Sequence, residues 1–558
     1  MNESFPDWLE DVWAKSPDKG VSGKYVSLPQ HTFDVLTKLS EIMALRPNLP
    51  QMVNMPNLWN ILFWALFLHD FGKSAKGFQE MLRGGKSWGH RHEVFSVAFL
   101  NWLKGFSQEE YHLIASIILS HHKEAEELFL LYPFSVKSDE DTISNVISQF
   151  DDHVLEALWR WLDKYMTVWI NILYLNDKGI MIPQLLSIKD AIKQIKEKGV
   201  SNIRYWLKSY RGLVKELNRN YEISSILSLL FMRGHALTAD HMASAHVDKL
   251  PQISCSLKNE KRFEQLGMTE KTLYTHQKEC SKIIDSVILI APTGSGKTES
   301  ALLWAFNQRY NGGSFNRLFY TLPFQASMNA MYQRLNSHLF SGQVGLEHSK
   351  NVLTLYRFLI EDDYNPEQAT KKAKWLKELV RLNYYPIKVL SPYQILKAFY
   401  RVRGYESIMT DFTKACFILD EIHAYEPERL AMILCSVRFL REILKAKFFV
   451  MSATLPGMIQ KCLFEALEDA AIVKATPELF KRFVRHKSIV LDGDLLDECW
   501  LDHICKKIGE YNSILICCNT VKRAQQAFLQ IKQRIGQKID IILIHSRFNI
   551  KDRLIKEA

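Results

Sequence analysis

Residues 287–298 read VILIAPTGSGKT, and they give the strongest indication of the fold of the second half of the chain. It joins an apolar strand to a glycine-rich loop, and Lys297 and Thr298 then begin a helix. The glycines allow the loop to wrap so that its amides point at phosphate oxygens. Lys297 reaches the same phosphates, and the Thr298 hydroxyl can ligate Mg²⁺. The stretch therefore predicts an ATP site made by Thr293, Gly294, Ser295, Gly296, Lys297 and Thr298.

A second stretch supplies the acidic groups that a nucleotide-hydrolysing site needs. Residues 416–423 read CFILDEIH, an apolar run that ends in two carboxylates. Asp420 is expected to hold the Mg²⁺, while Glu421 orients and deprotonates the attacking water. An acidic pair that caps a helix is the alternative interpretation. Because the pair follows a strand in a chain that also has a phosphate loop, we favour the hydrolytic interpretation.

The apolar runs of the second half are short, β-branched or aromatic, and they alternate with helical stretches. Buried parallel strands separated by crossover helices give an α/β layer fold. The expected strands are 287–290, 317–321, 387–390, 415–419, 448–450, 513–517 and 539–544. Residues 1–250 instead repeat apolar side chains at three- and four-residue spacing, which predicts an all-α domain. A polar linker is expected at 251–268.

A third motif, Ser452-Ala453-Thr454, follows the expected strand at 448–450. With it, the order of motifs resembles a superfamily 2 helicase of the DEAH-like branch. The resemblance implies a RecA-like helicase domain over 269–485, which binds ATP with Mg²⁺, and part of a second RecA-like domain over 486–558.

The same resemblance implies roles for further residues. Gln277 would read the adenine ring. The residues that would couple ATP hydrolysis to domain movement are His423, Ser452 and Thr454. Two loops that follow strands look like those that hold a nucleic-acid backbone, and their residues are Pro323, Gln325, Ser391, Tyr393 and Gln394. A simple turn is the alternative interpretation of these loops.

The all-α half contains a set of histidines and aspartates that a helical domain would rarely hold by chance. They are His31, His69, Asp70, His92, His121, His122 and Asp240. His69-Asp70 and His121-His122 each follow a strongly apolar helical run, so their side chains can turn back toward a common point. Neutral imidazoles with carboxylates suit Mn, Fe, Co, Ni or Zn better than Mg or Ca, which prefer oxygen-rich shells. Taken singly, each histidine could instead cap a helix or lie in the core.

Residues 69–73 read HDFGK, and with them the set resembles the HD-superfamily metal phosphohydrolases. The resemblance implies one ion held by His31, His69, Asp70 and Asp240, and a second, bridged by Asp70, held by His92, His121 and His122. Two ions could activate water and neutralise the leaving oxygen of a phosphodiester. Asp70 would thus be catalytic, and Lys73 would lie near the scissile phosphate unless it is a solvated lysine. His90 is a rival for the place of His92, and the histidines expected not to bind metal are His112, His235, His241 and His246.

Together the two motif sets resemble the CRISPR-associated helicase–nuclease of type I systems. The resemblance implies a cytoplasmic prokaryotic enzyme that degrades single-stranded DNA of an invader after a guide-RNA surveillance complex recruits it. The expected cofactors are ATP with Mg²⁺ and two ions among Mn, Fe, Co and Ni. Two other functions stay open: a nucleic-acid-binding or partner-docking module with a silent HD site, and an HD nucleotide phosphohydrolase.

Composition agrees with a folded protein of several domains. Of 558 residues, 47% are hydrophobic and 24% are charged, which excludes a disordered chain. The longest apolar run, 61–68, is far shorter than the ~20 residues of a membrane helix, so we expect no membrane span. No secretory signal is visible, and nine cysteines without a C-x-x-C pair suit reduced thiols in a cytosol.

The formal charge of +10 is concentrated in one segment. Residues 189–219 carry nine Lys/Arg and three Asp/Glu, with Tyr205, Trp206 and Tyr210 among them. Cations and stackable rings along a groove suit single-stranded DNA. An amphipathic helix with a solvated basic face and buried aromatic rings is the alternative, and we favour it.

The expected second RecA-like lobe contains only its opening elements. No Gln-x-x-Gly-Arg-like segment follows to supply arginines to the γ-phosphate, and such an arginine can be worth ~10³–10⁵ in rate. We therefore expect this chain to bind ATP but to hydrolyse it poorly and not to translocate. A separate chain could complete the helicase, or the sequence could be part of a longer one.

Overall fold

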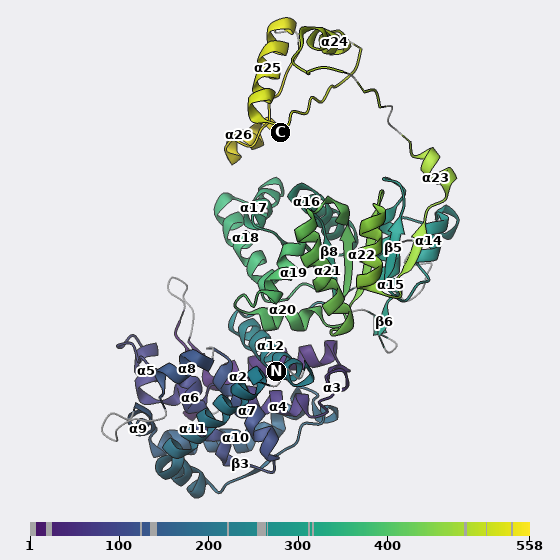
Figure 1. Ribbon diagram of the computed structural model, residues 1–558. Coiled ribbons are helices and arrows are strands. Elements are labelled where there is room, and N and C mark those ends of the chain that lie inside the picture. The colour runs from purple at the N-terminus through teal and green to yellow at the C-terminus, as the bar shows by residue number, and fades with distance from the viewer. Residues whose placement is uncertain are drawn as a thin grey trace. The chain divides into compact units, whose positions relative to one another are not determined.

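A computed structural model describes residues 7–17, 25–122, 125–133, 142–219, 223–253, 264, 266–310, 313–314, 317–484, 488–490, 492–508, 510–536 and 539–557 (Figure 1). The chain divides into two compact units, Met1–Phe483 and Val484–Ala558. The domain boundaries expected near residues 250, 268 and 485 stay predictions. Most of the expected linker, residues 254–263 and 265, lies outside the described residues.

The first part of the larger unit is helical, which confirms the predicted all-α domain. Its helices are α1 (Asp7–Glu10), α2 (Leu28–Leu45), α3 (Leu49–Met52), α4 (Leu58–Leu68), η1 (Phe71–Ser74), α5 (Lys76–Leu82), α6 (His92–Ser96), η2 (Val97–Trp102), α7 (Gln108–Ser120), α8 (Ala125–Leu131), α9 (Thr142–Ile147), α10 (Asp152–Ile172), η4 (Asn176–Lys178), α11 (Ile188–Arg219) and α12 (Ile223–Ser244). Short antiparallel pairs join β1 (Trp13–Lys15) to β2 (Val26–Ser27) and β3 (Leu103–Lys104) to β4 (Gln184–Leu185).

Helix α4 lies at the centre of this domain. All of its residues are buried, because apolar side chains cover every face of the helix. Near its end, Phe67 packs against Trp161 and Trp169 of α10, with ring centroids 5.3 Å apart in both pairs. The chain leaves α4 directly into His69 and Asp70, so the apolar packing of this helix determines where that pair lies.

The second part of the larger unit is built on a seven-stranded parallel sheet, which confirms the predicted α/β domain. The strand order is β13-β5-β12-β11-β8-β10-β9. The strands are β5 (Val287–Ile290), β8 (Leu318–Thr321), β9 (Val344–Glu347), β10 (Ile387–Leu390), β11 (Cys416–Asp420), β12 (Lys447–Ser452) and β13 (Ala471–Lys474). A small ribbon pairs β6 (Arg309–Tyr310) with β7 (Gly313–Ser314). In the middle of the sheet, the Phe417 ring stacks between Phe319 and Phe448 at 4.8 and 5.1 Å.

Helices cover both faces of this sheet (Figure 1). They are η5 (Glu270–Thr272), α14 (Thr275–Cys280), α15 (Lys297–Asn307), α16 (Gln325–Arg334), η6 (Leu335–Leu339), α17 (Asn351–Glu361), α18 (Pro366–Arg381), α19 (Pro392–Phe399), α20 (Tyr405–Phe412), η7 (Ile422–Ala424), α21 (Pro427–Glu442), α22 (Gly457–Leu467) and α23 (Pro477–Arg482). Strands β9 and β13 were not expected from the sequence. They are the two edges of the sheet, and an edge strand needs a weaker apolar pattern than a strand paired on both sides.

The smaller unit contains α24 (Glu498–Ile508), α25 (Val521–Ile535) and α26 (Ile550–Glu557). The prediction of strands at 513–517 and 539–544 is wrong for this structure. Neither segment is paired in a sheet among the described residues. A strand needs backbone partners on a neighbouring strand, and these segments find none, so apolar residues such as Leu515 and Ile542 stay exposed.

Within the larger unit, α12 of the helical domain packs along α20 of the sheet domain (Figure 1). Gly234 makes this approach possible, because a Cβ atom there would lie 2.6 Å from Thr410 Cγ2 and 2.7 Å from the carbonyl oxygen of Glu406. Arg233 forms an ion pair with Glu406 beside it. The helix that carries Asp240 is therefore held against the sheet domain.

A candidate two-metal centre and a nucleotide site

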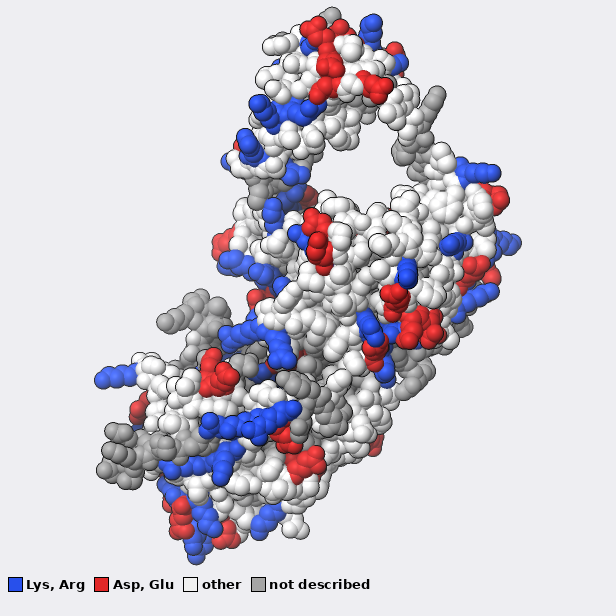
Figure 2. All heavy atoms as spheres, viewed as in Figure 1, with Lys and Arg blue, Asp and Glu red and all other residues white. Residues whose placement is uncertain are grey.

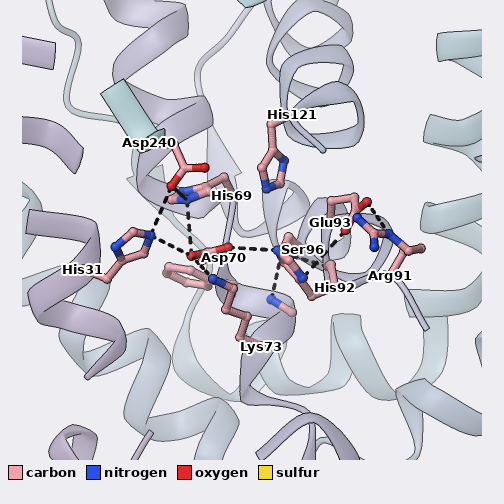
Figure 3. Close-up of polar contacts among 12 residues, drawn as sticks. His31, His69, Asp70, Lys73, Arg91, His92, Glu93, Ser96, His121 and Asp240 are labelled. Atoms are coloured by element: carbon pink, nitrogen blue, oxygen red, sulfur yellow. Dashed lines mark hydrogen bonds and ion pairs between the residues drawn. The ribbon is translucent and has the colours of Figure 1, made fainter. Parts of the chain in front are cut away.

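Several elements of the helical domain meet at one point (Figure 3). His31 comes from α2, His69 and Asp70 from the end of α4, and Asp240 from α12. His92 begins α6, while His121 and His122 follow α7. The structure thus brings together all seven residues that the sequence singled out, from segments as distant as residues 31 and 240.

These residues form two groups. His31, His69 and Asp240 make one, and Asp70, His92, His121 and His122 make the other, with the potential ligand atoms of each group within 4.8 Å of one another. Asp70 faces both: its Oδ2 atom lies 3.3 Å from Nε2 of His31 and of His69, and its Oδ1 atom lies 3.0 Å from Nε2 of His92. One carboxylate therefore joins the two groups.

The donor atoms fit a metal centre. Among the described residues, Asp70 Oδ1 and Nε2 of His31, His69, His92 and His121 are buried without a hydrogen-bond partner, and Asp70 Oδ2 is paired with the Lys73 ammonium. The tautomer is determined in two of these rings, because Nδ1 of His69 donates to Leu66 O at 2.7 Å and Nδ1 of His121 donates to Ile118 O at 2.6 Å. A ring whose Nδ1 holds the proton presents a lone pair at Nε2.

The charge states also suit metal binding. Burial lowers the pKa of His92 and of His121 to about 4, and it lowers the pKa of His122 as well. Burial alone would raise the pKa of Asp70, but the neighbouring His69 and Lys73 outweigh it and hold that pKa well below its ordinary value. The imidazoles of His92, His121 and His122 are therefore neutral beside an ionised carboxylate, the forms that bind a cation. Burial would lower the pKa of His69, but Asp70 outweighs burial and raises that pKa.

Two features of the 69–73 segment orient the centre. Lys73 lies on η1, and its Nζ atom is 2.7 Å from Asp70 Oδ2. The amide of Gly72 donates to Ser96 Oγ at 2.8 Å, and that hydroxyl donates to His92 O at 3.0 Å. A Cβ atom on Gly72 would lie 2.1 Å from the same carbonyl oxygen, so only glycine allows this segment to approach α6.

The other histidines of the domain lie outside both groups. His90 packs edge-on against Trp88 at 5.2 Å, so the structure favours His92 over its rival. His235 is buried at the α12–α20 contact, and burial lowers its pKa to about 3. His112, His241 and His246 are also absent from the two groups among the described residues.

The phosphate loop lines a separate cavity of about 610 Å³ at the carboxyl ends of β5 and β11. Its walls include Gln277, Thr293, Gly294, Gly296, Lys297, Thr298, Asp420 and Glu421. Lys297 Nζ lies 3.3 Å from Glu421 Oε1, so the ammonium faces a carboxylate where a phosphate is expected. Burial, and then the neighbouring Glu421, raise the pKa of Asp420 to about 6.

Two residues predicted to bind the nucleotide, Ser295 and Gln277, form hydrogen bonds within the protein. Ser295 is fully buried and its hydroxyl donates to Pro292 O at 2.8 Å, so this side chain shapes the loop. Gln277 accepts from the Tyr274 amide at 2.8 Å and donates to Gly296 O at 3.2 Å. The glutamine amide therefore contacts the phosphate loop directly.

The three predicted coupling residues gather beside Glu421. Ser452 Oγ lies 2.9 Å from His423 Nδ1 and donates to Thr454 O at 2.6 Å. His423 Nδ1 is also 3.4 Å from Glu421 Oε2. The end of β12 is thus linked to the end of β11 by side-chain contacts.

The residues predicted to bind nucleic acid follow the carboxyl ends of two adjacent parallel strands, β8 and β10. Pro323 is half-buried, and the exposed Gln325 donates to Ser349 Oγ at 3.0 Å. Ser391 is buried and Gln394 half-buried. Tyr393 is exposed, and its hydroxyl accepts from Arg429 at 3.3 Å.

The basic segment at 189–219 lies within α11. Trp206 is buried and donates to Asn101 Oδ1 at 2.8 Å, whereas Tyr205 is 48% exposed. The helix is therefore amphipathic, as favoured, although one of its three rings faces solvent. Figure 2 shows Lys and Arg side chains gathered on the visible face of the helical domain, with Asp and Glu among them.

The sequence pointed to no role for some residues at these sites. Tyr320 on β8 donates its hydroxyl to Asp420 Oδ2 at 3.1 Å, and Arg334 lines the nucleotide cavity. In the sequence Tyr320 is one aromatic residue within the apolar run of a buried strand, and Arg334 belongs to no recognisable motif. Neither carried a signal that separates it from its neighbours.

Three family models match successive parts of the chain. The model for the Cas3 HD domain matches residues 13–173, that for the DEAD/DEAH box helicase matches 274–462, and that for the C-terminal part of the CRISPR-associated nuclease/helicase Cas3 matches 510–558. Over residues 13–173 and 510–558 the chain is similar to Cas3 proteins. The Cas3 HD match covers the helices that carry His31, His69, Asp70, His92 and His121.

Curated Cas3 proteins are similar to the chain over most of its length. The chain is 26% identical to a putative Cas3 nuclease/helicase of Methanocaldococcus jannaschii, over 88% of this chain and 67% of that one. It is 25% identical to a Cas3 nuclease/helicase of Methanothermobacter thermautotrophicus, over 89% and 61%. A crystal structure of T. fusca Cas3 with ATP has the same fold, with a TM-score of 0.54 and 17% identity, over 98% of this chain and 66% of that one. The chain thus spans about two thirds of the length of these Cas3 proteins.

None of the described helices is both long and apolar enough for a membrane span.

Proposed function

We propose that the helical domain cleaves phosphodiester bonds of single-stranded DNA with two transition-metal ions, in prokaryotic cytoplasm and in defence against invading DNA. The observation that carries the proposal is the position of Asp70, whose two oxygens face two separate groups of ligand atoms. Bound ions would supply an activated water and neutralise the leaving oxygen. We assign His31, His69 and Asp240 to one ion, and His92, His121 and His122 to the other.

The donor set supports the choice of metal. Five histidine nitrogens with two carboxylates suit Mn, Fe, Co or Ni, whereas Mg and Ca prefer oxygen ligands. Lys73 lies 2.7 Å from Asp70 and supplies a positive charge where the scissile phosphate would lie.

We further propose that the sheet domain binds ATP with Mg²⁺ and, where a complete second RecA-like lobe accompanies it, drives movement along single-stranded DNA. The arrangement of Lys297 opposite Glu421, with Asp420 beside it, supports nucleotide hydrolysis. Tyr393 and Gln325 are exposed beyond the carboxyl ends of β10 and β8, which supports contact with a DNA backbone. The CRISPR association of the relatives supports a type I guide-RNA surveillance complex as the recruiting partner.

The nuclease proposal is tested with circular single-stranded DNA and Mn²⁺, Co²⁺ or Ni²⁺. The unaltered chain should degrade the circle, and Asp70→Ala should abolish degradation because both ions lose their shared ligand. Asp163→Ala, which changes an exposed aspartate of the same domain, is the matched control and should cut normally. Degradation that survives Asp70→Ala would refute the proposal, as would hydrolysis of deoxynucleoside triphosphates with the circle left intact.

A further inference from the structure

We propose that a groove between α12 and α18, together with Lys15, binds the nucleotide next to the scissile phosphate of a single-stranded nucleic acid. The inference rests on the proposed nuclease function and names the part of the substrate that a second site would hold. The groove has a volume of about 230 Å³. It is lined by His241, Ser244, Ala245, Trp375, Glu378, Arg381 and Leu382.

The lining of the groove suits a base more than a phosphate. Trp375 is 41% exposed there, an unusual position for an indole in this protein, and Ala245 and Leu382 add apolar surface. The Arg381 side chain donates to Glu378 at 2.8 Å, so these two charges cancel each other. Stacking on an exposed aromatic ring holds any base, because every base has a π face.

The groove begins next to the candidate metal centre. His241 follows Asp240 in the chain, and Ser244 donates its hydroxyl to Asp240 Oδ1 at 3.3 Å. The same helix end thus contributes a proposed metal ligand on one side and groove residues on the other. A strand whose phosphate lies at the metal centre would bring its neighbouring base within reach of Trp375.

Lys15 provides the cation that this arrangement needs. Its ammonium donates to Ser244 O at 3.0 Å, and this is its one hydrogen bond among the described residues. Since an ammonium carries three N–H donors, two remain for a phosphate. Lys15 therefore lies on the Asp240 side of the centre, whereas Lys73 lies on the Asp70 side.

The strand that carries Lys15 is held firmly in this position. Trp13 lies two residues before Lys15 in β1, and its backbone N–H and C=O each form a 2.9 Å hydrogen bond with the Gln79 side chain. Gln79 also donates to Lys73 O at 2.7 Å. Both lysines are thus positioned by one buried amide, which would keep two neighbouring phosphates at a constant spacing.

The inference predicts a difference between two substrates of the Mn²⁺-loaded chain. Bis(p-nitrophenyl) phosphate has a single phosphodiester and reaches only the metal centre, whereas an oligothymidylate of five residues also reaches the groove. Trp375→Ala should raise KM for the oligonucleotide about tenfold, as the loss of one stacked base does, with kcat little changed. Trp375→Phe should restore most of the loss, and Lys374→Ala, an exposed neighbour on α18, should behave like the unaltered chain.

Lys15→Ala has its own signature. In a plot of log KM for the oligonucleotide against log salt concentration, the slope should be lower by about 0.7, because one phosphate contact is lost. Lys15→Arg should keep the slope. A mere structural role would leave the slope unchanged.

Each outcome separates the inference from the function on which it rests. If Trp375→Ala and Lys15→Ala impair both substrates equally, these residues only maintain the metal centre and the inference is overturned. An unchanged KM for the oligonucleotide overturns it too. If the unaltered chain hydrolyses neither substrate, the nuclease proposal fails. Anisotropy of the fluorescein-labelled oligonucleotide then tests the groove by itself, and equal binding with and without Trp375→Ala rejects it.

Discussion

Asp70 Oδ1 lies 3.0 Å from Nε2 of His92, although the other oxygen of the same carboxylate faces a different group of histidines. The two residues come from separate helices and meet because the segment after Asp70 passes close against α6. The shared carboxylate makes Asp70 unlike the other proposed ligands, which each belong to one group.

This position predicts unequal effects of ligand removal on metal stoichiometry. Asp70→Ala should abolish tight binding of both ions, whereas Asp240→Ala should weaken one and leave the other. Calorimetric titration with Mn²⁺ would measure the number of ions bound per chain. Two tightly bound ions in Asp70→Ala would contradict the shared role of this carboxylate.

Gly72→Ala should disturb the centre without removing any ligand. The added Cβ would lie 2.1 Å from His92 O, so the backbone must shift and carry His92 with it. We expect a loss of about 1–3 kcal/mol in stability and weaker Mn²⁺ binding, measured by thermal unfolding and titration. Gly212→Ala, in open space on α11, is the control and should stabilise its helix by up to about 1 kcal/mol.

Glu421→Gln should separate ATP binding from hydrolysis. The Glu421 carboxylate lies 3.3 Å from Lys297 and must release it when a phosphate binds, so its neutralisation should leave ATP affinity equal or higher. Hydrolysis should fall by about 10²–10⁴-fold with the loss of the base. Lys297→Ala should instead weaken ATP binding. A fluorescent ATP analogue and phosphate release report the two properties, with the exposed Glu428→Gln as control.

Asp411 predicts a pH dependence of stability. Its carboxylate accepts from Arg317 at 2.5 Å and from Lys388 at 3.0 Å, with Arg46 at 3.5 Å. Burial would raise the pKa of Asp411, but Lys388, Arg317 and Arg46 outweigh it and lower it to about 2. Because the folded pKa is below the ordinary 3.8, the ionised form stabilises the fold fully above pH 4 and ceases to do so as pH falls through 2.

The corresponding test is Asp411→Asn. At neutral pH it should cost about 3–5 kcal/mol, because it leaves buried cations without their anion. The gap in unfolding temperature between the variant and the unaltered chain should stay constant above pH 4 and close toward pH 2. A gap that persists at pH 2 would show that the carboxylate acts through packing alone. Asp469→Asn, at an exposed site, should show no gap at any pH.

Motifs made of consecutive residues were predictable from the sequence. The phosphate loop at 287–298 and the segment 416–423 carry their chemistry within a few residues, and the strands before them are central in the sheet. Central strands must be apolar on both faces, which makes them visible. The edge strands β9 and β13 lack that requirement, and the sequence did not indicate them.

The chemistry of the two sites could be predicted from residue types alone: a phosphate loop, an acidic pair after a buried strand, and five histidines with two aspartates that suit transition metals. The tertiary structure was needed to show that Asp70 faces two groups and that His92 rather than His90 joins them. It was also needed to show that Lys15 bonds Ser244 and that Trp375 lines a groove with His241. Local backbone preference acts over a few residues, so it can specify a loop or a strand. Contacts such as Lys15 with Ser244 and Asp70 with His92 depend on how whole helices pack, which no short stretch of sequence encodes.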